Sequence, residues 1–187
     1  ELTKMLLESD LLQEDTEHYM LTGPLTAVTI PATLQDSLMA RLDRLGTTKE
    51  IAQLGATIGR EFSYDLLHAV SPLDEEILQQ GLKQLVEAEL VYQSGRPPQA
   101  TYLFKHALIQ DTAYQSLLKS RRQQLHQQVA QVLAERFSQT VETQPELVAH
   151  HYTEAGLIAQ AVPYWQRAGQ KTIERSAHAE SVAHLTK

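Results

Sequence analysis

The amino-acid sequence predicts a mainly α-helical protein with one β-hairpin near the middle of the chain. Aliphatic residues recur at three- and four-residue spacing over most of its 187 residues, which is typical of amphipathic helices. Two short apolar runs, 90–93 and 101–104, flank a loop rich in Gly and Pro, and this pattern indicates a hairpin. Hydrophobic residues make up 42% of the chain and charged residues 21%, a composition that excludes a disordered protein.

The first thirty residues predict one short helix and two extended segments. Residues 3–12 have helical leucine spacing, whereas 18–22 and 26–31 are rich in Tyr, Thr and Val. Gly23-Pro24 and Pro31 close the two extended segments, since the residue before a proline avoids the helical region.

Four helices are expected between this region and the hairpin. The first begins at Thr33, which we expect to cap it, and ends at Gly46. The second helix ends at Gly59, the third covers residues 64–70 and the fourth covers residues 74–88. The apolar stripes of the first and last helices consist of Leu34, Leu38, Leu42 and Leu45, and of Ile77, Leu78, Leu82, Leu85 and Val86. The last three of these helices are followed by the hairpin, and this is the order of elements in a winged-helix module.

After the hairpin the sequence returns to helical spacing. Helices are expected over 106–118 and 121–137, from Pro145 to Gly156, from Ile158 onward, and again from about His178. The segment around Gly156 fits one tetratricopeptide (TPR) unit with an irregular successor. We therefore predict a winged-helix-like module followed by an antiparallel TPR-like helical array.

Two aromatic residues of the TPR-like segment are candidates for binding a partner. Tyr152 and Trp165 fall at the aromatic positions of its two helices, and Ala161 falls at a close-packing position. We expect both rings to fill the groove between the helices, with partner binding as the alternative. Pro163 is expected to kink the second helix.

No catalytic or metal motif is present. The sequence has no phosphate-binding G-x-x-x-x-G-K-[ST] loop, no G-x-S-x-G and no H-E-x-x-H, so we expect a non-catalytic chain without its own cofactor. It has no Cys, which excludes disulfides and thiolate sites. His150 and His151 are interpreted as the polar end of a packed helix, because no third zinc ligand accompanies His150 and Glu154.

The charge pattern argues against nucleic acid and membrane partners. The net charge is −7, and no apolar run approaches the ~20 residues of a spanning helix. The helix over 74–88, which would be the recognition helix of a DNA-binding protein, offers Glu75, Glu76 and Glu87 beside its glutamines. This acidic face favours contact with protein or solvent over contact with DNA.

His106 is the candidate binding residue of the module. It lies directly after the second hairpin strand and directly before a helix, where backbone N–H groups are available to an anion. An imidazole at this point can bond a phosphate oxygen. A histidine bonded only to its own backbone is the alternative.

Several segments resemble one family of signalling proteins. Residues 30–38 (IPATLQDSL), 41–45 (RLDRL), 58–62 (IGREF) and 104–108 (FKHAL) are similar to the region after the ATPase core in STAND-type signalling ATPases. The similarity runs along the whole chain, and it is closest to bacterial proteins that carry a class III adenylate/guanylate cyclase domain before the ATPase.

The resemblance implies a domain organisation and a role. Residues 1–30 would be the tail of the preceding ATPase helical subdomain, 31–138 the winged-helix-like module with trailing helices, and 139–187 the start of TPR-like repeats. His106 would contact the phosphate of ADP bound to the upstream nucleotide-binding domain of a longer cytoplasmic parent protein, although Ala107 stands where the family motif has Asp. The TPR-like array would sense a protein or small molecule and control the effector. A DNA-binding regulator and a plain TPR adaptor remain alternatives.

Overall fold

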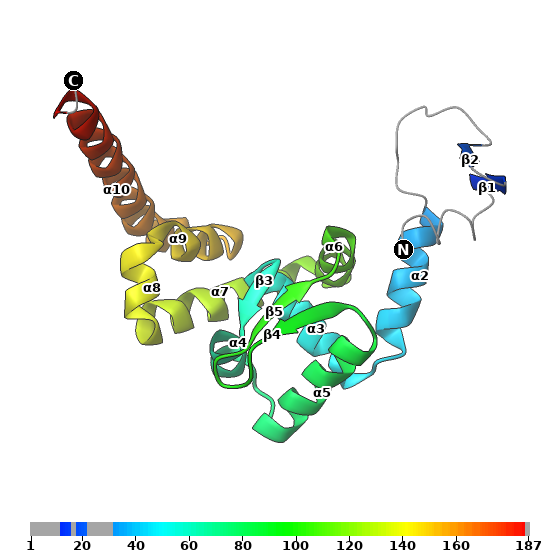
Figure 1. Ribbon diagram of the computed structural model, residues 1–187. Coiled ribbons are helices and arrows are strands. Elements are labelled where there is room, and N and C mark those ends of the chain that lie inside the picture. Colours follow the sequence, from blue (N-terminus) through cyan, green and yellow to red (C-terminus); the bar gives the residue numbers. More distant parts are fainter. Residues whose placement is uncertain (1–11, 16–17, 22–31, 186–187) are drawn as a thin grey trace.

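The computed structural model describes residues 12–15, 18–21 and 32–185, and the side chains of 35 and 37–174 among them (Figure 1). The predicted mainly α fold is confirmed. β1 (Leu12–Asp15) pairs antiparallel with β2 (His18–Leu21), which confirms an extended segment at 18–21. The expected helix over 3–12 lies outside the described residues except for Leu12, which begins a strand, and the extended segment over 26–31 also lies outside them.

We define residues 32–117 as the first unit of the fold. It consists of helices and the three strands of a small sheet. The elements are α2 (Ala32–Asp43), α3 (Thr47–Ile58), β3 (Glu61–Ser63), α4 (Tyr64–Val70), α5 (Glu75–Glu87), β4 (Val91–Ser94), β5 (Thr101–Phe104) and α6 (Ala107–Gln115). β5 is the central strand and pairs antiparallel with β3 and β4. The predicted helices and the hairpin are present, whereas β3 was not predicted.

Helix boundaries in this unit follow from local chemistry. Ser63 accepts a hydrogen bond from the backbone N–H of Leu66, 3.2 Å away, and so caps α4. Gly46 adopts a φ of 56°, which lets the chain turn between α2 and α3. The expected cap at Thr33 is wrong, because α2 already begins at Ala32.

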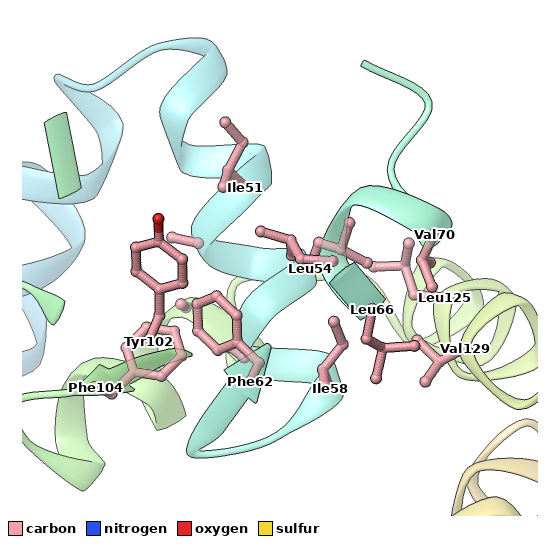
Figure 2. Close-up of a cluster of buried hydrophobic side chains, with 14 of the residues drawn as sticks. Ile51, Leu54, Ile58, Phe62, Leu66, Val70, Tyr102, Phe104, Leu125 and Val129 are labelled. Carbon is pink, nitrogen blue, oxygen red and sulfur yellow. The ribbon is translucent and has the colours of Figure 1, made fainter. Parts of the chain in front are cut away.

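The core of the first unit lies between α3 and the inner face of the sheet (Figure 2). Phe62 of β3 stacks on Tyr102 of β5, with ring centroids 5.6 Å apart. Gly55 of α3 permits this approach, since a Cβ there would lie 2.8 Å from the Phe62 ring. The α5 stripe is buried at Leu78, Leu82 and Leu85, but the prediction for Ile77 is wrong, because its side chain is 44% exposed.

The C-terminal part consists of α7 (Lys119–Arg136), α8 (Ser138–Thr143), α9 (Pro145–Glu154) and α10 (Ile158–Leu185). α7 packs on α3 and α4 on one side and on α9 on another, and α9 packs on α10. We call α9 and α10 the helical pair; α10 projects away from the first unit in Figure 1. The prediction of a separate helix near His178 is wrong, since α10 continues through that position and through Pro163. α8 was not predicted.

Candidate functional site

His106 lies at the junction between β5 and α6, as predicted. Its backbone is extended, with φ −134° and ψ 144°, and its carbonyl accepts a hydrogen bond from the N–H of Ile109, 3.1 Å away. The imidazole does not cap the helix, and the side chain is exposed. His106 therefore stands at the N-terminus of a nine-residue helix, where the N–H groups that precede Ile109 have no intrahelical acceptor.

The surroundings of His106 are fixed by contacts to the hairpin and to α3. Lys105 forms an ion pair with Glu89 at 3.3 Å, and its ammonium lies 4.9 Å from the centroid of the Tyr92 ring. Gln110 donates a hydrogen bond to the carbonyl of Ala56 at 3.3 Å, which ties the first turn of α6 to α3. A helix start with an imidazole is suited to an anionic group, whereas the Lys105 ammonium is already paired with Glu89.

The two aromatic candidates of the helical pair, Tyr152 and Trp165, differ in their environment. Tyr152 is buried and stacks on Tyr164, with ring centroids 5.7 Å apart, while Ala161 is buried between the two helices. Trp165 is 47% exposed and donates a hydrogen bond from Nε1 to Oγ1 of Thr153 at 3.1 Å. Tyr164, rather than Trp165, is thus the ring of α10 that packs on Tyr152.

An exposed apolar stripe runs along α10. Its members follow at spacings of four and three residues and then at eight, so they share one face of the helix. They are Ile158, Val162, Trp165 and Ile173. This face lies beside the one that packs on α9, and among the described residues it is the longest row of exposed large hydrophobic side chains.

The face of α5 that a DNA reader would use is acidic, as the sequence indicated. Glu75 and Glu76 are exposed, and the carboxylate of Glu75 accepts a hydrogen bond from Gln79 at 3.1 Å. The hairpin tip adds only Arg96 as an exposed cation among residues 94–100. Repulsion between these carboxylates and phosphate opposes binding of this face to a duplex.

The sequence interpretation missed a buried polar chain between α6, α7 and α9. Oη of Tyr114 lies 2.9 Å from Nε2 of His126, and Nδ1 of His126 lies 2.8 Å from Nδ1 of His151. His126 is 2% exposed and His151 is 0% exposed. We call Tyr114, His126 and His151 the histidine chain. The interpretation of His150 and His151 as a polar helix end is wrong for His151, which belongs to the interior, whereas His150 is exposed.

Burial of the two imidazoles opposes their charged forms. Loss of water lowers the pKa of His126 to about 4, an effect that Glu154 counteracts and that His150 and Arg122 reinforce. Burial, followed by the neighbouring His126 and His150, lowers the pKa of His151 to about 3. Both rings are therefore neutral at pH 7. The sequence contains one signal of this burial: His126 lies next to Leu125 on the apolar side of α7, and His151 lies next to Tyr152 on the apolar side of α9.

Within residues 12–15, 18–21 and 32–185, no three His, Asp or Glu side chains are grouped so that they could hold a metal ion. No helix in the part of the chain that the structure describes is both long and apolar enough to cross a membrane.

The comparisons with known proteins give one distant relative. An uncharacterized protein of Rhizobium meliloti (strain 1021) is 31% identical over 145 residues, which are 77% of this chain and 14% of that protein. The chain thus spans about one seventh of the length of this relative. No protein-family description matches the sequence. No solved structure matches it.

Proposed function

We propose that the chain is a regulatory, non-catalytic segment of a STAND-type signalling ATPase. In this proposal the first unit is a winged-helix-like module and the helical pair begins a TPR-like array. The observation that supports it is the element order α3–β3–α4–α5–β4–β5, a helix–strand–helix–helix–hairpin unit, with His106 directly after the hairpin. The resemblance of residues 104–108 to the sensor motif of that family points to the same position.

The proposed mechanism is a switch controlled by nucleotide state. His106 and the start of α6 contact the phosphate of ADP on an upstream nucleotide-binding domain and keep the module closed. A protein or small molecule on the helical array favours the open, ATP-bound state, and opening releases an effector. We propose a class III adenylate/guanylate cyclase as that effector and the cytoplasm of a bacterium as its place.

The test uses the parent protein with its nucleotide-binding domain. His106→Ala is expected to weaken ADP binding by roughly 10- to 100-fold, since a hydrogen bond to a charged group contributes about 1.5–3 kcal/mol. ADP retained after purification and the Kd of a fluorescent ADP analogue are measured. His68→Ala is the matched control, because His68 is also exposed but lies on α4. Equal ADP affinity in both variants would contradict the sensor role.

A plain adaptor is the second candidate, and the exposed stripe of α10 favours it. Such an adaptor would bind an apolar helix or peptide through Ile158, Val162 and Trp165. Its affinity for that partner would be the same with ADP, with ATP or without nucleotide on the parent protein. The switch instead requires at least a severalfold difference between the two nucleotides.

A further inference from the structure

The histidine chain crosses the surface by which the helical pair is attached. His126 lies on α7, which is anchored to the first unit through α3 and α4, and His151 lies on α9. α10 packs mainly on α9 rather than on the first unit. The bond between His126 and His151 therefore lies inside the contact between the helical pair and the rest of the chain.

The hydrogen bond between the two imidazole rings forms only when one of the two Nδ1 atoms carries a hydrogen and the other does not. Two Nδ1 atoms 2.8 Å apart share one hydrogen, so one ring donates and the other accepts. A doubly protonated pair carries a hydrogen on both Nδ1 atoms, and the contact becomes a repulsion between two donors. Nε2 of His151 is buried without a hydrogen-bond partner among the described residues, so nothing there compensates a positive ring.

The charged and titratable groups around the pair come from three helices. α6 contributes Tyr114, and α7 contributes Arg122, whose guanidinium carbon lies 5.1 Å from the centroid of the Tyr114 ring. α9 contributes His150 and Glu154, both exposed. Only Glu154 favours protonation, and its solvent-exposed position weakens that effect. Among the described parts of α8 and α10, no titratable group acts on either ring.

Among its described side chains, the first unit contains no comparable group. Its buried polar side chains are Thr48, Thr57 and Thr112, none of which takes up a proton, and its buried tyrosines are neutral at every relevant pH. Within the described residues, His126 and His151 are the only buried side chains that would gain a charge on mild acidification once they are exposed to water. The effect of acid is therefore concentrated at the contact between α7 and α9.

We propose that the buried pair His126–His151 makes attachment of the helical pair to α7 sensitive to protons. The helical pair is held against α7 at neutral pH and is released as the pH falls below about 6.5, while the first unit stays folded. Release exposes two imidazoles to water, and each then binds a proton. This is a conformational device of the fold and does not depend on the proposed ATPase context.

The size of the effect follows from proton uptake. The pKa values in the attached state, about 4 and about 3, lie below the ordinary value of about 6.5, so protons bind preferentially to the released state. Attachment is at its full strength above pH 6.5 and weakens as the pH falls toward 4. Between pH 7.5 and 5.5, the equilibrium constant for attachment of the helical pair to α7 is expected to decrease about 10-fold per histidine and about 100-fold for the pair.

The experiment measures the distance between the first unit and α10 in the full chain. The chain has no Cys, so cysteines introduced at Gln80 of α5 and Gln166 of α10 can be labelled selectively with a fluorescence-transfer pair. Both glutamines are exposed. Transfer is expected to fall between pH 7.5 and 5.5, while far-ultraviolet circular dichroism retains the helical signal.

The matched variants separate the pair from its neighbours. His126→Gln/His151→Gln keeps a donor and an acceptor but cannot take up a proton, so its attachment is expected to be independent of pH. His150→Gln should keep most of the pH dependence, because His150 is exposed and burial is the larger cause of both lowered pKa values. Constant transfer in the unaltered chain, or an unchanged pH response in the double variant, would overturn the proposal.

A second measurement decides the matter if the double variant does not attach at pH 7.5. The imidazole resonances of the unaltered chain are followed by NMR in the same pH range. Two rings are expected to stay neutral in the attached state and to become protonated only together with release. Rings that all titrate individually near pH 6.5, with no change in transfer, would exclude the device.

Discussion

The core of the first unit and the junction between α7 and α9 are both buried, but they are built from different chemistry. Phe62, Tyr102 and Phe104 pack with aliphatic side chains in the first, and the described side chains around them take up no proton in the physiological range. The junction buries two bonded imidazoles on α7 and α9, two helices that also bury Val129, Leu133 and Val148. An apolar core is stable over a wide pH range, whereas a buried titratable pair makes stability conditional on pH.

The largest expected effect comes from truncating the apolar core. Phe104 is 0% exposed, and its ring centroid lies 5.7 Å from that of Phe62. Phe104→Ala removes a large buried ring and leaves a cavity, so the free energy of unfolding should fall by about 3–5 kcal/mol. Urea denaturation followed by circular dichroism measures this loss. The same loss at pH 7.5 and 5.5 is expected, and a pH-dependent difference would mean that the two regions are coupled.

Acidification is expected to have the next largest effect. The released and unfolded states protonate His126 and His151 below pH 6.5, whereas the attached state leaves them neutral until about pH 4 and about pH 3. The free energy of unfolding should therefore decrease by roughly 3 kcal/mol between pH 7.5 and 5.5. Urea titrations at closely spaced pH values measure the slope. A flat profile in this interval would show that the pair is accessible to water in the folded chain.

Removal of one member of the histidine chain should cost less than truncation of the aromatic core. His126→Ala leaves Tyr114 and His151 without their shared partner, and an unsatisfied buried polar group costs about 1–3 kcal/mol. The loss is expected at pH 7.5 and should shrink at pH 5.5, because the variant has one buried imidazole fewer. His150→Ala is the control and should stay within about 0.5 kcal/mol of the unaltered chain. Equal losses in both variants would contradict the buried chain.

The same contrast explains how much of the fold could be predicted from sequence. α4 and α5 have helical leucine spacing and are separated by Pro72, and the hairpin has Gly95 and Pro97-Pro98 between its strands. β3 has three residues, too few for a period, and it forms only because β5, distant in the sequence, offers an edge. α10 was divided near His178 because the expected repeat imposed a break, although the residues there are helix formers without Gly or Pro.

The candidate sites divide in the same way. The position of His106 between a strand and a helix followed from local sequence alone. The pairing of His126 with His151 depends on the packing of α9 on α7, which no local pattern specifies. A histidine within an apolar stripe indicates burial but does not reveal its partner, so the chain could be recognised only from the fold.

Two adjacent aromatic residues of α10 give the smallest expected effects and sharpen the distinction between packing and surface. Tyr164 is half-buried and stacks on Tyr152, so Tyr164→Ala should lower the free energy of unfolding by about 1–2 kcal/mol. Trp165 is 47% exposed and has one hydrogen bond to Thr153, so Trp165→Ala should cost about 0.5 kcal/mol. Urea denaturation of both variants at pH 7.5 compares them. A larger loss for Trp165 would mean that it packs within the helical pair, as the repeat pattern indicated, whereas a small loss leaves its exposed ring available to a partner.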